Sequence, residues 1–338
     1  MKVLVTGATG FLGKHLVQKL VARGDEVCAL VWPPDTRSAL QNLPVAILEG
    51  DIQNANLVMQ AVKGNDVVFH CAGKVDDWGP RNEFYRVNVD GTRNILEASR
   101  VAGVKHFIHI SSLVVLGVPE TAPVDETMPY TTKPFNPYME TKLLSEKLVL
   151  EYHNKHKLPV TIIRPGILWG PGDTSIFPRL ERLASKGLMI FKMGTGNNVL
   201  CLSYVPNLVD ALLLAADVEN PDCQIYHIAD EERITSGAYF AALSKAIGVK
   251  QPAIPIPFFV LYIVASLFEL GAKLLRLSQS PLLTRYGLYL WSCTFIVNIS
   301  KAKKQLGYQQ QVFFKEGMKQ LTEWYAKTKS EYAPNVIV

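Results

Sequence analysis

The sequence predicts an α/β protein in which a doubly wound parallel sheet carries a smaller C-terminal α/β lobe. Three observations support this fold class. Short apolar runs alternate with stretches of helical periodicity in the first half of the chain, a glycine-rich turn follows the first apolar run, and the alternation loosens after Pro165. Strands that alternate with helices in this way form a parallel sheet with helices on both faces.

Six apolar runs have the length and composition of strands that are buried on both faces. They are Val3–Thr6, Glu26–Val31, Val45–Leu48, Asp66–His70, His106–Ile110 and Val160–Arg164. The stretches between them, near 12–23, 54–62, 82–103 and 138–157, have the periodicity of helices. Because each helix would connect two parallel strands, we expect right-handed crossovers and a Rossmann-type sheet.

The second half of the chain is less regular. A loop rich in glycine and proline spans 166–172, a helix is expected near 176–186, and an apolar segment at 189–193 precedes a turn at 194–196. We expect residues 1–165 to form the main domain, with 200–217 returning to it. Residues 166–199 and 218–330 would then form the smaller lobe.

Composition and charge narrow the class of protein. Of the 338 residues 48% are hydrophobic and 19% are charged, and the net charge is +5. Such a chain buries a large core, and its small, unclustered charge argues against a nucleic-acid partner. The five cysteines include no Cys-x-x-Cys pair, so we expect reduced packing residues, no metal site and a cytoplasmic protein. We expect no signal peptide, because the first strand begins at residue 2.

The first strand leads into Gly7, Gly10 and Gly13. The first glycine permits a tight turn, the second lets main-chain N–H groups approach a pyrophosphate, and the third lets the helix pack on the strand. The helix N-terminus adds partial positive charge. A purely structural turn is the alternative, but the position between the first strand and the first helix favours a dinucleotide site. The expected contacts are Gly7, Thr9, Gly10, Phe11, Leu12 and Gly13.

Two later strand ends extend the expected dinucleotide site. Asp51 follows the third strand, where a carboxylate can accept a hydrogen bond from the adenine amino group while Ile52 lies against the ring. The fourth strand ends in small residues that let the cofactor ribose lie close to the main chain. This segment comprises Cys71, Ala72, Gly73 and Lys74.

Tyr138 and Lys142 are one helical turn apart and project from the same face of a helix. A free phenol titrates near ~10, so a base near neutral pH needs a pKa lower by roughly three units, and a neighbouring ammonium group lowers it. Ser112, at the end of the fifth strand, can bond a substrate oxygen. Tyr325 and Lys329 repeat the spacing on a polar helix that lacks such a hydroxyl. We therefore expect the first pair and the serine to be catalytic.

Together these motifs resemble those of an extended short-chain dehydrogenase/reductase over essentially the whole chain. They are the glycine turn, Asp51-Ile52, Asn88-Val-Asp-Gly-Thr92, Ser111-Ser112, Tyr138 with Lys142, and Arg164-Pro165-Gly166. The resemblance implies that Tyr138 is the acid/base and that Lys142 binds the nicotinamide ribose and lowers the tyrosine pKa. The further cofactor contacts that it implies are Asn88, Ser111, Tyr138, Lys142, Pro165, Gly166 and Ile167.

A sugar-nucleotide epimerase of the same family is the first alternative. Such enzymes carry an arginine that grips a diphosphate, and Leu200 stands at that position here. A non-catalytic NADP-sensing regulator is the second alternative, although a sensor needs no catalytic residues. The expected pocket is apolar and indicates a hydrophobic substrate. Its residues are Val75, Trp78, Leu113, Val114, Trp169 and Phe177.

Four further segments resemble the 3β-hydroxysteroid dehydrogenase and decarboxylating sterol dehydrogenase branch, and bacterial 2-alkyl-3-oxoalkanoate reductases look equally close. The segments are 169–173, 254–276, 281–284 and 303–308. We therefore expect an NAD(P)-dependent oxidoreductase that interconverts a secondary alcohol and a ketone. Its substrate would be a 3β-hydroxysteroid, a sterol or a long-chain 3-hydroxy or 3-oxo acid.

The sequence leaves the choice between NAD and NADP open. NAD-preferring proteins carry an acidic residue at the end of the second strand, where this chain has Val31. NADP-preferring relatives often have an arginine next, where this chain has Trp32. Arg37 could reach a 2′-phosphate, although an arginine exposed on a loop is the alternative.

Residues 254–276 are apolar nearly all round and are too short and interrupted for a membrane span. An interfacial helix or a lid over a lipid-like pocket is one interpretation, which would make the protein peripherally membrane-associated. A buried helix of the smaller lobe or a dimer contact is the other. The family resemblance also implies a homodimer formed through the helices near 82–103 and 138–157.

Overall fold

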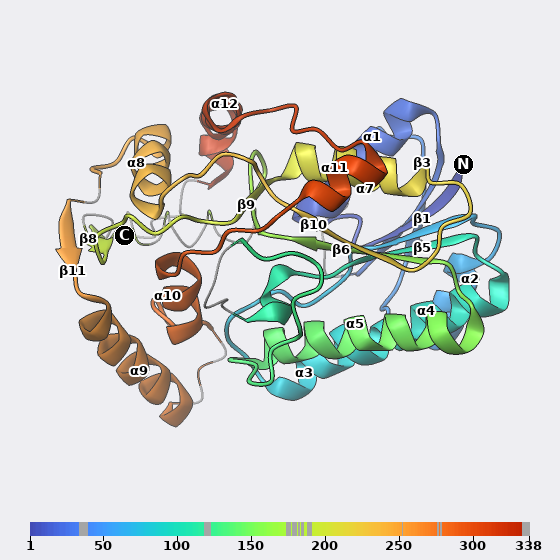
Figure 1. The fold of residues 1–338 in the computed structure, drawn as a ribbon, viewed down its shortest axis with the longest axis horizontal. Helices are drawn as coiled ribbons and strands as arrows, with labels where there is room; N and C mark the ends of the chain where they lie inside the picture. The colour runs from blue at the N-terminus through green and yellow to red at the C-terminus, as the bar shows by residue number, and fades with distance from the viewer. Residues whose placement is uncertain are drawn as a thin grey trace.

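The computed structural model describes residues 1–33, 40–117, 123–173, 177, 181, 183, 186–187, 191–251, 253–275, 277 and 279–332. Its centre is a parallel sheet of seven strands in the order β10-β6-β5-β4-β1-β2-β3 (Figure 1). The strands are β1 (Lys2–Thr6), β2 (Glu26–Val31), β3 (Val45–Glu49), β4 (Val67–His70), β5 (His106–Ile110), β6 (Val160–Pro165) and β10 (Gln224–Ile228). The predicted fold class is confirmed, and the six expected strands agree with the structure to within one residue at each end.

Helices cover both faces of the sheet (Figure 1). One face carries α1 (Phe11–Arg23), α7 (Val205–Ala216) and α11 (Ser300–Leu306), and the other carries α2 (Ala55–Val62), α4 (Gly91–Ala102) and α5 (Pro137–His156). Strand residues alternate between the two cores, so that Val3 and Val5 pack toward one face and Leu4 toward the other. This burial on both sides is the reason for the continuous apolar runs in the sequence.

Strand β10 corrects the expected division into lobes. Residues 218–330 were expected to belong to the smaller lobe, but 224–228 pair with β6 and form the edge of the main sheet. Tyr226 and Ile228 pack in the same core as Val205 and Leu208 of α7. The preceding helix α7 therefore acts as one more crossover, and α11 packs on β10 and α7 as well.

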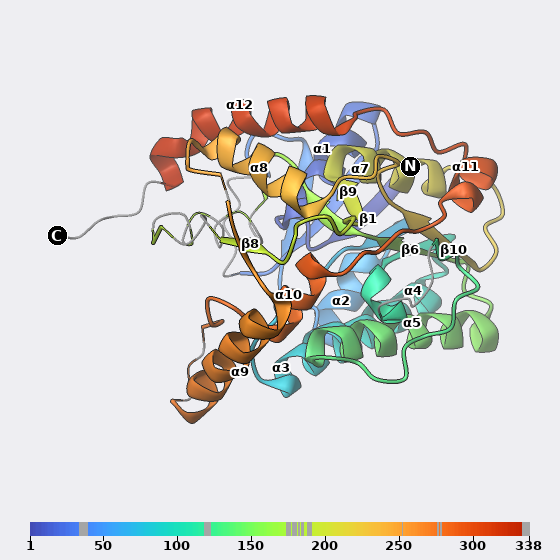
Figure 2. The same cartoon turned by 60° about the vertical axis from the view of Figure 1, so that its left-hand side comes forward.

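The smaller lobe contains two short parallel ribbons, β7 (Ile167–Trp169) with β9 (Leu202–Tyr204) and β8 (Phe191–Met193) with β11 (Ile254–Ile256). Helices α8 (Ser236–Ile247) and α12 (Phe314–Tyr332) pack against each other, whereas α9 (Phe258–Leu274) and α10 (Arg285–Ser292) lie toward the other end of the lobe (Figure 2). In the part of the chain that the structure describes, no helix is both long and apolar enough to cross a membrane.

The region expected to be one helix at 82–103 has an interruption. Helix α3 (Arg81–Tyr85) leads through a π-helical turn at Arg86–Asp90 into α4. A π turn inserts an extra residue into the helix and re-aims the side chains around it, and such turns occur mostly at functional sites. Asn88, one of the predicted site residues, lies in this turn.

Candidate active site

The predicted motifs meet along one edge of the sheet. The glycine turn follows β1, the Cys71–Lys74 segment follows β4, Ser111 and Ser112 follow β5, and Gly166 follows β6. These four strands are neighbours in the order β6-β5-β4-β1 and are all parallel. Their carboxyl ends therefore lie side by side at the edge where open α/β sheets bind ligands.

Glycine is favoured at the three positions of the turn for three different structural reasons. Gly7 has a φ of +66°, and a Cβ there would lie 2.8 Å from the main chain of Ala72. A Cβ on Gly13 would lie 2.0 Å from the carbonyl oxygen of Gly7, so this glycine brings the helix onto the turn. Gly10 is exposed, and a Cβ there would meet the Gly7 oxygen at 3.2 Å. The outer side of the turn thus keeps the open cradle that a pyrophosphate requires.

The residues after the turn present main-chain groups rather than side chains. Phe11 and Leu12 are buried in the core beneath the sheet edge, and Gly10 caps α1 without a side-chain hydrogen bond. The first N–H groups of a helix have no partner inside the helix and carry partial positive charge. This arrangement fits the phosphates of a dinucleotide.

The segment after β4 approaches the site in the same way. Lys74 turns its ammonium group to Glu83 at 3.1 Å, so this lysine offers main-chain atoms to the site. Asn88 holds the segment in place, because its Oδ1 accepts from the Lys74 N–H at 2.7 Å and its Nδ2 donates to the Lys74 oxygen at 3.1 Å. The same amide group donates to the Thr141 hydroxyl of α5 at 3.0 Å. Asn88 therefore connects the β4 loop with the helix that carries the catalytic candidates.

At the far end of the expected cofactor site, Asp51 accepts the Gln53 N–H at 2.9 Å and stays partly exposed. Ile52 is buried and packs against Gly91, where an added Cβ would lie 3.0 Å from the Ile52 side chain. Much of the Ile52 side chain therefore belongs to the core. Arg37 lies outside the described residues. Trp32 is exposed at the end of β2.

Helix α5 begins at the residues that its sequence predicts. The Asn136 side chain caps the helix by accepting the Met139 N–H at 2.9 Å, and Pro137 occupies the first turn. Tyr138 therefore lies at the helix start, beside the carboxyl edge, where its phenol is hydrogen-bonded to the Ser112 side chain. Lys142, one turn later, donates its ammonium group to the Ile110 carbonyl oxygen. The structure thus brings the three catalytic candidates together.

Burial sets the ionisation of this pair. It raises the pKa of Tyr138 to about 12, which the hydrogen bond from Ser112 partly opposes. Burial lowers the pKa of Lys142 to about 8, while the negative charge of Glu146 and the Cys71 thiol act to raise it. The phenol is therefore protonated and the lysine cationic at neutral pH, which suits proton donation to a carbonyl oxygen.

A buried ion pair behind the catalytic candidates was not anticipated from the sequence. Glu146 is fully buried on α5 and pairs with the buried Arg164 of β6 at 2.5 Å. The Ser111 hydroxyl donates to the same carboxylate, so the Ser111 side chain points away from the expected cofactor site. Any contact of Ser111 with a cofactor therefore comes from its main chain. The spacing of Glu146 from Lys142, one helical turn, was a signal that could have identified it.

A second unanticipated group lies on the other side of Tyr138. The segment 279–286, which we call the strap, leads from α9 into α10. Asp77, in the loop after β4, accepts hydrogen bonds from Ser280 at 2.7 Å and from Thr284. Neither pairing has a local sequence signal, because about 200 residues separate the partners.

The strap also brings an aromatic ring to the site. Tyr286 is buried and meets the Tyr138 ring edge-on, with a centroid distance of 6.3 Å. Trp78, beside Asp77, donates its indole N–H to the Leu277 oxygen at 3.1 Å. These contacts connect the loop after β4 with the connection between α9 and α10, beside the Tyr138 ring.

Two of the predicted pocket residues belong to the core instead. Trp169 is 1% exposed, packs against Tyr204 and Tyr239, and donates to Asp230 at 2.7 Å. Phe177 is buried and lies in the same aromatic cluster. Their large apolar side chains stabilise the smaller lobe, whose short strands alone cover little surface. The structure therefore places both residues in the core of the smaller lobe, and their contact with a substrate stays a prediction.

The remaining predicted residues lie near the sheet edge. Val75 is exposed and Trp78 and Val114 are half-buried, whereas Leu113 packs in the core below them. Gly166 is required by packing, because a Cβ would lie 2.4 Å from the Cys201 oxygen. Pro165 is buried beside it, and Ile167 is half-buried.

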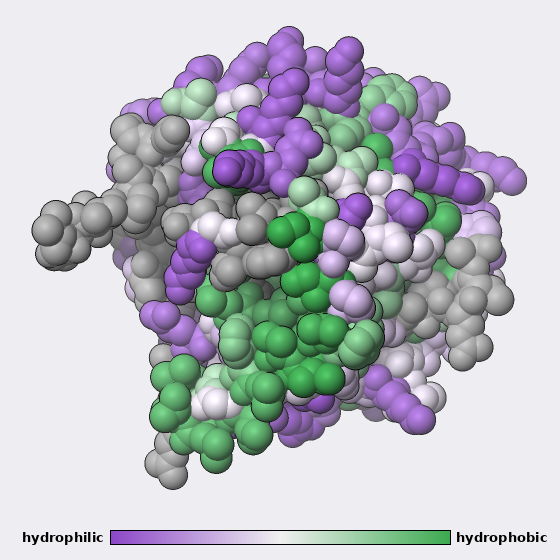
Figure 3. Space-filling model, turned by 90° about the vertical axis from the view of Figure 1, so that its left-hand side faces the viewer, coloured by the Kyte–Doolittle hydropathy of each residue, from purple (hydrophilic) through white to green (hydrophobic). Residues whose placement is uncertain are grey.

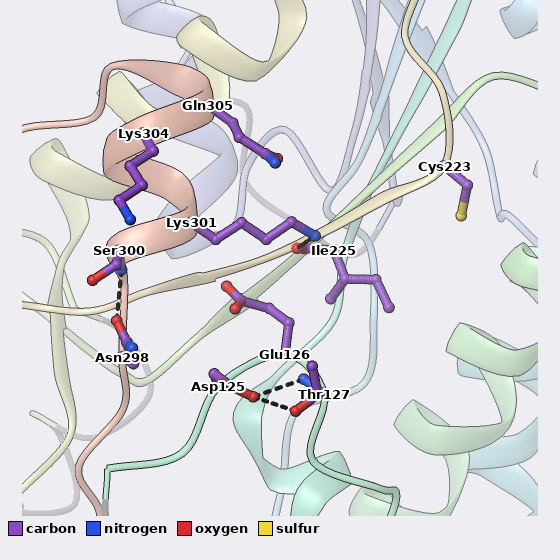
Figure 4. Close-up of a pocket in the computed structure, with 10 residues that line it drawn as sticks. All are labelled: Asp125, Glu126, Thr127, Cys223, Ile225, Asn298, Ser300, Lys301, Lys304 and Gln305. Atoms are coloured by element: carbon purple, nitrogen blue, oxygen red, sulfur yellow. Dashed lines mark hydrogen bonds between the residues drawn. The ribbon is translucent and has the colours of Figure 1, made fainter.

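Two surface hollows among the described residues lie elsewhere. One, of about 580 Å³, opens at the β10 edge of the sheet, and its Lys301 is bonded to the Ile225 oxygen at 2.9 Å (Figure 4). It is lined by Asp125, Glu126, Thr127, Cys223, Ile225, Asn298, Ser300, Lys301, Lys304 and Gln305. Another, of about 620 Å³, lies between α8 and α12. Neither contains a predicted site residue. The described residues also include no cluster of three metal-ligating side chains.

Comparison with known proteins is consistent with this geometry. The model of the 3-beta hydroxysteroid dehydrogenase/isomerase family matches residues 4–258. The 2-alkyl-3-oxoalkanoate reductase of Shewanella oneidensis is 31% identical over 330 residues, which cover 94% of this chain and 84% of that protein. The human decarboxylating sterol-4-alpha-carboxylate 3-dehydrogenase is 32% identical over 328 residues, with 94% and 87% covered.

Solved structures share the whole fold. The crystal structure of gox2253 has a TM-score of 0.80 at 29% identity and covers 96% of this chain and 98% of its own. The dTDP-glucose 4,6-dehydratase DesIV of Streptomyces venezuelae, solved with NAD, has a TM-score of 0.79 at 23% identity over 99% of both chains. At that identity the second likeness shows the fold alone. The family match and the two related enzymes show that the chain belongs to the 3-beta hydroxysteroid dehydrogenase/isomerase family.

Proposed function

We propose that the protein is an NAD(P)-dependent oxidoreductase that interconverts a secondary alcohol and a ketone on a hydrophobic substrate. The observation that carries the proposal is the Tyr138 phenol, which is bonded to Ser112 and lies one turn from Lys142 at the carboxyl edge of the sheet. The names of the related enzymes support a 3β-hydroxysteroid, a sterol or a long-chain 3-oxo acid as the substrate.

Each catalytic candidate has a role that its environment supports. Ser112 and Tyr138 hold the substrate oxygen by hydrogen bonds, and the protonated phenol donates a proton to it when a ketone is reduced. In the oxidative direction the phenol must first lose its proton, and the resulting phenolate, which a neighbouring cation such as Lys142 stabilises, accepts the hydroxyl proton. Bound NAD(P) supplies or accepts the hydride at its nicotinamide ring.

The cofactor would lie along the carboxyl edge. The glycine turn and the start of α1 would hold its phosphates, Asp51 would bind its adenine, and the Lys142 ammonium would bond the nicotinamide ribose. Both NAD and NADP fit the described residues, because Val31 provides no carboxylate that would repel a 2′-phosphate. Titration of the purified protein with NADH and NADPH measures the preference directly.

The catalytic assignment is tested with Tyr138→Phe. Loss of the phenol oxygen removes the proton donor, and we expect kcat to fall by about 10³-fold or more while NAD(P)H binds with nearly unchanged Kd. Tyr325→Phe is the matched control, since it carries the same Tyr-x-x-x-Lys spacing but its hydroxyl bonds Glu181 in the smaller lobe. Full turnover by Tyr138→Phe would contradict the assignment.

The two alternatives make different predictions for the same purified protein. Leu200 is buried in the core of the smaller lobe and provides no cation for a diphosphate. We therefore expect no thermal stabilisation by UDP-sugars and no tightly retained NAD. Cofactor binding without turnover on a broad panel of sterols, steroids and long-chain oxo acids would instead favour an NADP-sensing regulator.

We also propose that α9 docks on an anionic lipid surface, from which a poorly soluble substrate enters. Hydrophobic residues gather over this part of the molecule (Figure 3), and Phe259, at 66% exposure, is one of several apolar side chains on the open face of α9. The single acidic residue of the helix, Glu269, is buried and bonded to Arg285 of α10 at 2.8 Å. The exposed face is therefore apolar, and Lys273 near its end can meet anionic head groups.

Liposome co-sedimentation tests the docking. The protein should pellet with anionic vesicles, less so at high salt, and Phe258→Ser/Phe259→Ser should reduce both pelleting and activity on long substrates. Phe313→Ser, which removes an exposed ring before α12, is the control and should behave as the parent does. A double variant that pellets as well as the parent would show that α9 is an ordinary packed helix.

A homodimer through α4 and α5 completes the proposal. These two helices pack side by side on one face of the sheet and leave α9 free at the other end of the molecule (Figure 1). Light scattering coupled to size-exclusion chromatography should give twice the mass of one chain. A monomeric mass would exclude the dimer without affecting the catalytic assignment.

A further inference from the structure

The strongest unexplained feature near the site is the carboxylate of Glu146. It is 0% exposed, and it receives hydrogen bonds from three separate parts of the chain. We infer that Glu146 is a positioning residue, which places a buried carboxylate one helical turn from Lys142 and fixes the turns after β5 and β6 against the helix that carries Tyr138. This inference rests on the proposed function.

The hydrogen bonds of Glu146 connect α5 with the segments that follow β5 and with the end of β6. The Ser111 hydroxyl, next to Ser112, donates to Oε2, and the Tyr130 hydroxyl donates to Oε1 at 2.7 Å. Arg164, which directly precedes the Pro165–Ile167 segment, donates from Nη2 to Oε1 at 2.5 Å and from Nε at 3.1 Å. One buried carboxylate therefore ties the ends of β5 and β6 to α5. Buried charges with several such bonds define a unique arrangement of the groups around them.

The Glu146 carboxylate also interacts electrostatically with the Lys142 ammonium group. The groups that face Lys142 are His70 and Cys71 from β4 and its end, His109 from β5, and Glu146 from its own helix. Burial holds both histidines neutral, so they do not compensate the lysine charge. The negative charge of Glu146 thus counteracts the lowering of the Lys142 pKa that burial causes.

The test measures two pH profiles of the Glu146→Gln variant. Glutamine keeps the shape and one acceptor oxygen but removes the charge. Lys142 should therefore lose its proton at lower pH, because the loss of a neighbouring opposite charge moves a pKa by about one unit or more. We expect NAD(P)H affinity, followed by fluorescence, and kcat/KM both to decline on the alkaline side about one pH unit earlier than in the wild type.

Three control variants separate charge from fold. Arg164→Gln removes the cation but keeps the carboxyl group of Glu146, so it should destabilise the protein without moving the alkaline decline to lower pH. Glu146→Gln/Arg164→Gln removes the unpaired buried charge, which restores stability if the single variant unfolds, and should retain the shift. Glu151→Gln, on an exposed turn of α5, should change neither profile.

The outcomes distinguish the inference from the proposed function. A folded Glu146→Gln or double variant whose affinity and kcat/KM profiles coincide with the wild type would overturn the role of Glu146. Retained turnover in Tyr138→Phe would overturn the catalytic assignment instead. The binding profile reports Lys142 in the free protein and needs no turnover, so it remains informative in either case.

Discussion

At the residue scale, the glycine turn shows how identical residues in one motif serve different purposes. Gly13 is required because the carbonyl of Gly7 occupies the space that a side chain would need, whereas a Cβ on the exposed Gly10 would meet the same oxygen only at 3.2 Å. The first requirement concerns folding, and the second concerns the ligand. Two alanine substitutions should therefore separate these effects.

Gly13→Ala places a Cβ 2.0 Å from a main-chain oxygen, so helix or turn must shift and the free energy of unfolding should fall by about 2 kcal/mol or more. Gly10→Ala meets the same oxygen at 3.2 Å and should unfold within a few degrees of the parent, but bind NAD(P)H at least about tenfold more weakly. Thermal unfolding and fluorescence titration measure the two effects. Equal loss of stability in both variants would contradict this division.

At the scale of elements, the strap connects the exposed helix α9 with the catalytic edge. Asp77 accepts from Ser280 and Thr284, and Glu269 accepts from the Arg285 N–H at 2.7 Å, so both ends of the strap are fastened. Tyr286, in the strap, packs against the Tyr138 ring, where we expect the substrate to bind. Loss of these contacts should therefore weaken substrate binding and leave cofactor binding unchanged.

Asp77→Ala removes the acceptor for two strap hydroxyls. We expect faster hydrogen exchange in 279–286 and a several-fold higher KM for hydrophobic substrates, with the Kd for NAD(P)H unchanged. Asp76→Ala is the neighbouring control, because the Asp76 carboxylate bonds the Trp78 N–H within its own loop. Unaltered exchange in the strap of Asp77→Ala would show that Asp77 does not hold it.

At the scale of the whole molecule, buried histidines make stability depend on pH. Burial lowers the pKa of His70 to about 3, of His106 to about 4 and of His227 to about 3, and it lowers the pKa of His109 well below the usual value. In the unfolded chain these rings titrate near ~6.5. Below that pH the unfolded state binds protons that the folded state does not, so stability falls with decreasing pH.

Each such histidine should cost up to about 1.4 kcal/mol for every pH unit below the unfolded value. The urea midpoint should therefore drop between pH 7 and pH 5, before most carboxylates are protonated. His109→Leu should reduce this dependence by one proton with little loss at pH 7, because neither ring nitrogen has a hydrogen-bond partner among the described residues. His156→Gln, on the surface, should leave the slope unchanged. A slope in His109→Leu equal to that of the parent would contradict the account.

The sequence by itself determined the elements and the order of the motifs. Strands buried on both faces require continuous apolar runs, and the glycine turn and the Tyr138–Lys142 spacing are local patterns within a few residues. For this reason the parallel sheet, six of its strands and the helix that carries Tyr138 and Lys142 could be predicted. The roles of Ser112, Tyr138 and Lys142 stay predictions that the variants above test.

Only the tertiary structure decided which distant residues meet. Residues 224–228 form a strand of the main sheet because they pair with the edge of β6. Trp169 and Phe177 lie in the core of the smaller lobe, where their large apolar side chains pack together with other aromatic rings. The ion pair of Glu146 with Arg164 and the bonds of Asp77 depend on how β6 and the strap pack against other elements. Contacts of this kind leave no periodic or short-range pattern in a sequence, because they depend on how elements that are distant in the sequence pack together.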